Sequence, residues 1–265
     1  MATVADIYHY LDGIAPFRYQ ESYDNAGILV GDKTMEVNGV MLSLDTTEAV
    51  IEEAAAKGCN LVIGHHPIIF SGVKRIDYEH YISRTIVSAI KHDIAIIAIH
   101  TNLDNVLQFG VNQRIAEQLG VTNISILNPN KALDDNGTIG SGVIGELDIA
   151  QDPMTYLQAI KDKMKAGVVK YTNICKSSVK TVAICGGSGS FLLPTAIAKG
   201  ADIFITSDFK YHEFFEANDQ IIIADIGHYE SEQYTVDLLQ VLISQKFSNF
   251  AIHLTKTVTN PVNYL

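Results

Sequence analysis

Short apolar runs alternate with amphipathic stretches along most of the chain. The apolar runs are rich in β-branched residues and nearly continuous, as expected for strands that helices cover on both faces. We therefore expect strands at residues Gly39–Leu44, Leu61–Ile63, Ile94–Ile99, Val179–Ile184, Ile203–Thr206, Ile221–Ala224 and Phe250–Leu254.

The stretches between these runs contain good helix formers and repeat apolar residues at intervals of three and four. Gly58, Gly120 and Gly200 each follow such a stretch, where a left-handed residue commonly ends a helix. The alternation predicts an α/β protein with mixed, largely parallel sheets covered by helices. The expected helices are Glu48–Lys57, Tyr81–Lys91, Val111–Leu119, Met154–Met164, Phe191–Lys199 and Glu230–Ser244, and near the N-terminus Val4, Ile7, Leu11 and Ile14 also lie at helical spacing.

A break in the alternation suggests a domain boundary. Residues 127–142 contain Pro, Asn, Asp and Gly and little that could form a core. With about 150 residues per domain as a guide, 265 residues fit one large domain or two modest ones. We expect an N-terminal domain over residues 1–127 and a C-terminal domain over residues 128–265, with a return of the last strand to the first domain left open.

Composition narrows the class of protein. The formal net charge is −11, which argues against an electrostatic grip on nucleic acid or on an anionic membrane. The three cysteines form no C-x-x-C pair, so neither a disulfide framework nor a thiolate zinc site is expected. The N-terminus lacks the features of a signal peptide, and the longest apolar runs are far too short to span a bilayer. We expect a soluble, cytoplasmic protein.

Three of the apolar runs are followed directly by histidine. In open α/β sheets, ligands gather at the carboxyl ends of strands because the loops there converge on one crevice. A single histidine after a strand is more often a hydrogen-bonded loop residue, and an Asp or Glu at a helix start is more often a cap. Three matching strand ends favour a shared site. They carry His65 and His66, His100 and Asp104, and His228 and Glu232.

The spacing within each segment fits this interpretation. Gly64 and Pro67 bracket the His-His pair, so the chain turns there and both rings can approach one site. His228 and Glu232 are four residues apart at a helix start, on one face of its first turn.

Imidazoles and carboxylates without a thiolate suit Zn, Fe, Mn, Co or Ni. Five ligands from three segments exceed what one ion needs. Two divalent ions about 3.5–4 Å apart would use them, with one carboxylate as a bridge, and Glu232 is our choice for it. Their residual positive charge would lower the pKa of a bridging water and attract an anionic or carbonyl substrate, which is the basis of metal-assisted hydrolysis.

Several longer motifs resemble the GTP cyclohydrolase 1 type 2 homolog family, also described as Nif-three-like dinuclear metal centre hexameric proteins. The resemblance implies two interlinked α/β domains, a dinuclear metal site in the cleft between them and a homohexamer. Carried over residue by residue, it implies the metal ligands His65, His66, Asp104, His228 and Glu232, with His100 beside the site. The motifs are Tyr23–Asp32, Leu42–Ala54, Ile63–Phe70, Ile99–Asn105, Cys185–Ser190, Ala201–Ala217, Asp225–Glu232 and Thr257–Val262.

Other residues have two interpretations. The glycine-rich CGGSGS, Cys185–Ser190, suits a tight strand-to-helix turn better than a phosphate cradle. Lys210 and His212 either face the site as substrate-binding and proton-transfer groups or belong to an exposed helix start capped by Asp208. Asp45, with Glu48 three residues on, has the pattern of a helix cap.

Two functions remain open. The first is a metallohydrolase that acts on a small anionic substrate, with a nucleotide as one candidate, through a metal-bridging hydroxide. His100 or His212 would protonate the leaving group as the catalytic residue. The second is a non-catalytic, metal-stabilised hexameric ring that binds a partner protein or ligand.

Overall fold

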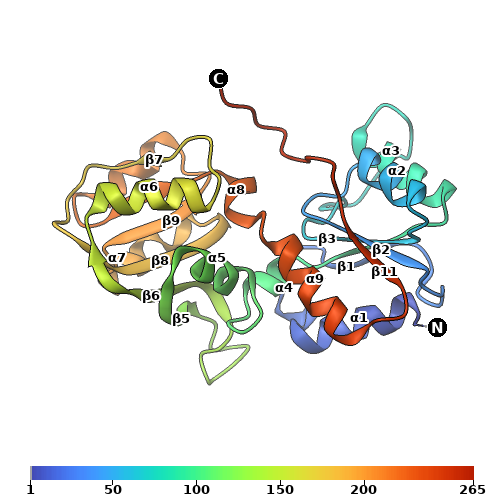
Figure 1. Ribbon diagram of the computed structural model, residues 1–265, viewed down its shortest axis with the longest axis horizontal. Helices are drawn as coiled ribbons and strands as arrows, with labels where there is room; N and C mark the ends of the chain where they lie inside the picture. The colour runs from blue at the N-terminus through green and yellow to red at the C-terminus, as the bar shows by residue number, and fades with distance from the viewer. Residues whose placement is uncertain (1) are drawn as a thin grey trace. The chain divides into compact units, whose positions relative to one another are not determined.

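The computed structural model describes residues 2–265, which form two compact units (Figure 1). The first unit contains the chain up to Leu103 together with Thr235–Pro261, and the second contains Asp104–Tyr234 with Val262–Leu265. The Pro- and Asn-rich residues 127–142 lie inside the second unit, where they connect β5 (Val121–Pro129) to β6 (Gly140–Gln151). The composition that suggested a domain boundary is equally typical of such a connection.

The first unit is built on a five-stranded sheet in the order β1-β4-β3-β2-β11. Four strands run parallel, and β1 pairs with β4 in the antiparallel direction. The last strand of the chain, β11, lies in this sheet next to β2. The strands are β1 (Gly27–Val30), β2 (Gly39–Ser43), β3 (Leu61–Gly64), β4 (Ala95–Ala98) and β11 (Ala251–Leu254).

Helices cover both faces of this sheet (Figure 1). On one face, α2 (Glu48–Ala56) and α3 (Tyr81–Lys91) bury Ile51 and Ala89 against strand residues such as Met41. On the other face, α1 (Val4–Ile14) and α9 (Thr235–Lys246) lie together, and the Tyr10 hydroxyl of α1 donates to a carbonyl of α9 over 2.8 Å. The short helices are η1 (Phe17–Tyr19) and α4 (Thr101–Asp104).

The second unit has a six-stranded mixed sheet in the order β5-β6-β8-β9-β10-β7. The three strands β8, β9 and β10 run parallel. β6 and β7 pair with them in the antiparallel direction, and β5 pairs antiparallel with β6. Its remaining strands are β7 (Lys170–Tyr171), β8 (Val179–Ser188), β9 (Ile203–Ser207) and β10 (Ile222–Asp225), and its helices are α5 (Val111–Leu119), α6 (Pro153–Lys163), η2 (Ser190–Leu192), α7 (Leu193–Ala198), η3 (Tyr211–Ala217) and α8 (His228–Glu232).

These elements confirm the α/β class, with two mixed sheets covered by helices. Local signals explain several boundaries. Thr3 and Asp6 form a capping box at the start of α1, and Gly120 ends α5 in the left-handed conformation at φ 76°. Among residues 2–265, no helix is both long and apolar enough to cross a membrane.

Candidate metal centre

In the first unit, the register of the sheet brings the histidine-bearing loops to one edge. Ser43 of β2 pairs with Gly64 of β3, and Gly64 pairs with Ala98 of β4, so the three parallel strands end side by side. His65 and His66 follow β3 directly, and His100 follows β4 by two residues. Within this unit the histidines therefore lie at the carboxyl ends of parallel strands, as predicted from the sequence.

The three histidines form one cluster, which we call the histidine group: His65, His66 and His100. Each offers a ring nitrogen, and these atoms lie within 4.8 Å of one another. The ring centroids are 4.9 to 5.3 Å apart. His65 is fully buried, and His100 is 9% exposed.

Each histidine is oriented through the same ring nitrogen. The Nδ1 of His65 donates to the carbonyl oxygen of Ile99 over 2.8 Å. The Nδ1 atoms of His66 and His100 lie 2.8 Å from carboxylate oxygens of Asp45 and Asp24. With the proton on Nδ1, a neutral ring carries its lone pair on Nε2. Metal-binding histidines have this arrangement when an acceptor bonds the N–H at Nδ1.

Asp24, which orients His100, precedes the edge strand β1. Because β1 is antiparallel, the residues that precede it reach the edge where β4 ends. The side chain of Asp24 is fully buried, and its carboxylate also accepts from the backbone and hydroxyl of Thr101. Burial alone would raise the pKa of Asp24, but His100 and Thr101 outweigh it and lower this pKa to about 2.

The second unit contributes what we call the carboxylate group: Asp104, His228 and Glu232. His228 and Glu232 share one face of α8, and Nε2 of His228 lies 3.2 Å from Oε2 of Glu232. A carboxylate oxygen of Asp104 lies within 4.8 Å of one of Glu232. Glu232, which is 2% exposed, is thus near both other members, as a bridging ligand must be.

Asp208 orients His228 as the other acceptors orient the histidine group. It follows β9, and its Oδ2 lies 2.6 Å from Nδ1 of His228. Burial disfavours a charged imidazole, but the hydrogen bonds and charges of Asp208 and Glu232 prevail and raise the pKa of His228 to about 11.

Gly187 makes room for Glu232. A Cβ atom at this position would lie 2.5 Å from Oε1 of Glu232 and 3.3 Å from Cε1 of His228, and the φ of Gly187 is +63°. Within CGGSGS, β8 continues through Gly186 and Gly187 to Ser188, and the turn into η2 follows at Gly189. The glycines serve here as residues without side chains, against which a buried carboxylate packs.

Asp104 lies in the single helical turn α4. Two further expectations need correction. Asp45 does not cap α2, because Thr47 does so by accepting from the backbone N–H of Val50. Asp208 does not cap η3, since it pairs with His228. In each case a polar side chain near a helix start had a more distant partner that local spacing cannot reveal.

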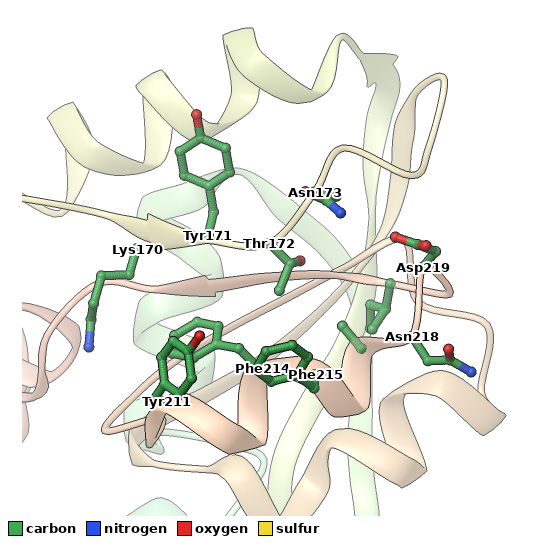
Figure 2. A pocket seen from close by; sticks show the side chains of 11 residues that line it. Lys170, Tyr171, Thr172, Asn173, Tyr211, Phe214, Phe215, Asn218 and Asp219 are labelled. Atoms are coloured by element: carbon green, nitrogen blue, oxygen red, sulfur yellow. The ribbon is translucent and has the colours of Figure 1, made fainter.

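Lys210 and His212 lie on the exposed side of the second unit. The ring of His212 packs beside Tyr211 and Phe215 on η3. Next to it is a groove of about 640 Å³ between η3 and the edge strand β7 (Figure 2). Figure 2 shows Phe214 and Phe215 on the η3 side of the groove and Lys170 on the β7 side.

Lys170 connects this groove to the loops that hold His228. Its Nζ lies 2.7 Å from Oδ2 of the buried Asp225. Asp225 also accepts from the backbone N–H groups of Phe209 and Gly227, which adjoin Asp208 and His228. Asp225 thereby fixes the two loops that bring His228 and its carboxylate partner together, a role for which the sequence offered no signal.

A two-unit α/β protein with a histidine group and a carboxylate group at strand ends defines a candidate metalloprotein. The family model of Duf34/NIF3 (NGG1p interacting factor 3) matches residues 2–261. The chain belongs to this family, which confirms the resemblance seen in its motifs.

Individual relatives agree with this assignment. A "GTP cyclohydrolase 1 type 2 homolog" of Campylobacter jejuni is 33% identical, over 98% of this chain and 99% of its own. The crystal structure of the Staphylococcus aureus hypothetical protein SA1388 is 32% identical and superposes with a TM-score of 0.89, over 99% of each chain. A Bacillus cereus protein related to NIF3 has the same fold, with a TM-score of 0.90 at 24% identity over 100% of this chain and 99% of that one.

The donors fit divalent metal ions in their chemistry. Buried imidazoles with a lone pair on Nε2 and carboxylates gathered around Glu232 are the donors that such ions select. The buried His, Asp and Glu side chains could therefore hold metal ions.

Proposed function

We propose that this chain is a metal-dependent hydrolase in which the histidine group and the carboxylate group bind two divalent ions together. Glu232 is the bridging ligand, and His65, His66, Asp104 and His228 complete the set. The single observation that carries this proposal is the common orientation of the four clustered histidines. In three of them Nδ1 faces a carboxylate, and in the fourth the N–H at Nδ1 donates to a carbonyl oxygen.

The chain connections support a joint site. Asp104 is the first residue of the second unit, and Glu232 lies two residues before Tyr234, where the chain leaves that unit. His100 and Asp104 are four residues apart, so their Cα atoms can be separated by at most about 14 Å. A connection this short favours ligands drawn from both units.

Two ions of charge +2 and two carboxylates would leave the centre positive, which favours a small anionic substrate. Phe70 supports a substrate that also carries a planar ring, such as a nucleotide. Its ring is nearly perpendicular to that of His100, with centroids 5.4 Å apart, and the residue is 46% exposed. An exposed aromatic ring thus lies beside the histidine group, where a planar ring could stack.

When bound, the ions would lower the pKa of a coordinated water and polarise the bond that it attacks. The residues of the chain have separate roles. Asp24 and Asp45 orient imidazoles, and Glu232 would help to hold the ions. Nε2 of His100 would take up the proton that the attacking water loses and pass it to the leaving group.

The test is a screen of the metal-loaded protein against nucleotides, phosphoesters and cyclic amides. We expect turnover that requires about two ions per chain and that Asp104→Asn abolishes. If chelation dissociates an assembly or lowers the melting temperature while no substrate is ever turned over, the alternative holds: a metal-stabilised ring that binds a partner. The homohexamer belongs to this proposal as well, and light scattering of the intact protein tests it.

A further inference from the structure

The C-terminal tail, residues 255–261, begins at the edge of the sheet that carries the histidine group. β11 runs parallel to β2, with Leu254 opposite Leu42. Thr255 continues this pairing by one residue, since its backbone N–H donates to the carbonyl of Leu42 over 3.0 Å. The tail therefore emerges on the same side as Asp45, which follows β2.

One carboxylate fixes the first part of the tail. Glu53 of α2 accepts from the hydroxyls of Thr255 and Thr257, over 2.6 and 3.0 Å, and from the backbone N–H groups of Lys256 and Thr257. Burial alone would raise the pKa of Glu53, but these donors and Lys57 hold it well below its usual range. A charged acceptor with this many donors fixes the course of the tail.

The next polar side chain of the tail reaches the histidine group through Asp45. The hydroxyl of Thr259 donates to Oδ2 of Asp45 over 2.6 Å, and Oδ1 of the same carboxylate lies 2.8 Å from Nδ1 of His66. Thr259, Asp45 and His66 thus form a continuous chain of hydrogen bonds between residues up to 214 positions apart in the sequence.

We propose that Thr259 is a positioning residue for His66, so that the tail completes one of the two metal sites. This inference rests on the proposed function. Asp45 is one-third exposed, and the Thr259 hydroxyl bonds the carboxylate oxygen that does not face His66. This bond helps to keep Oδ1 directed at His66. We assign His65 and His66 to different ions of the proposed pair, so loss of the hydroxyl should weaken the ion that His66 binds and spare the ion that His65 binds.

The experiment uses the full chain, freed of metal and titrated with Co²⁺, whose absorption spectrum reports each binding step. Loss of an orienting partner typically costs 10- to 100-fold in metal affinity. Thr259 acts one bond further out, so Thr259→Val is expected to weaken one of two Co²⁺ steps about 10-fold and to leave the other unchanged. Thr259→Ser, which keeps the hydroxyl, is expected to restore that step.

Thr257→Val is the matched control, because it removes a tail hydroxyl that bonds Glu53 and leaves Thr259 intact. Two wild-type steps in Thr259→Val would overturn the inference while the proposed function stands. Equal weakening in Thr257→Val would also overturn it, because tail docking in general would then be the cause. If the unaltered protein binds no Co²⁺, the proposed function itself fails.

Discussion

The histidine group and the carboxylate group differ in the charge of the side chains that they bring close together. Imidazoles can be neutral, so His65, His66 and His100 pack closely in a buried edge and need only acceptors for Nδ1. Carboxylates repel one another, and in the second unit a protonated His228 between Asp208 and Glu232 relieves that repulsion.

The two groups therefore differ in what metal binding would change. In the histidine group, the hydrogen bonds use Nδ1, and a metal on Nε2 would leave them in place. In the carboxylate group, Nε2 of His228 faces Glu232, so a cation there would displace the proton on Nε2.

Glu232→Gln should cause the largest loss, because it removes the one carboxylate that lies near both Asp104 and His228. We expect metal affinity to fall by at least about 100-fold, beyond the effect of removing an orienting partner. Metal content after dialysis measures it. Glu216→Gln, an exposed position on η3, is the control. Two retained ions with full activity in Glu232→Gln would refute a bridging role.

Gly187→Ala should weaken metal binding about 10- to 100-fold, because the new methyl group would displace Glu232. The left-handed backbone at this position adds about 1 kcal/mol of strain. Gly200→Ala carries the same strain, at φ +73°, but its methyl group would meet no atom within 4 Å. Calorimetric comparison of metal affinity in the two variants separates the effect of the collision with Glu232 from that of backbone strain. Equal metal affinities in both would disprove it.

Asp24→Asn should destabilise the first unit by about 2 kcal/mol near pH 7, since a buried carboxylate loses its charge-assisted hydrogen bonds. The folded pKa of about 2 lies below the unfolded value of about 3.9, so this stabilisation is present above pH 4 and is lost as the pH falls toward 2. Urea unfolding at several pH values checks both statements, with the exposed Asp32→Asn as control. A variant as stable as the parent at pH 7 would contradict them.

Metal binding should release about one proton from His228 near pH 8. In the metal-free protein its pKa of about 11 keeps it charged, so the stabilisation by its two carboxylates is complete below pH 6.5 and is lost as the pH rises toward 11. The apparent affinity should rise about tenfold per pH unit between pH 7 and 9. Calorimetry in buffers of different ionisation enthalpy counts the protons. An affinity independent of pH would show that His228 is not displaced.

Much of the fold follows from local pattern. The continuous apolar runs that predicted β2, β3 and β4 are strands, and the helices Tyr81–Lys91 and Val111–Leu119 have the predicted bounds. The hairpin strands β5 and β6 were missed because polar residues and glycine interrupt them, as at Thr122, Asn123 and Gly145. Pairing with neighbouring strands determines such segments, and periodicity alone does not show it.

The candidate site also has a part that could be predicted from the sequence and a part that could not. Its clustered side chains follow apolar runs, so their grouping within each unit could be anticipated. Their partners could not: Asp24, Asp45, Asp208 and Thr259 meet the histidines only through antiparallel pairing, sheet register or the path of the tail. Hydrogen bonds across 20 to 214 positions leave no local spacing to detect.

The most direct test is a crystal structure of the metal-loaded protein with anomalous data at the edge of the bound element. We predict two peaks about 3.5–4 Å apart, with Glu232 contacting both and with ligands from the histidine group and the carboxylate group. Peaks confined to one group, or side chains of the two groups too far apart to share an ion, would contradict the account.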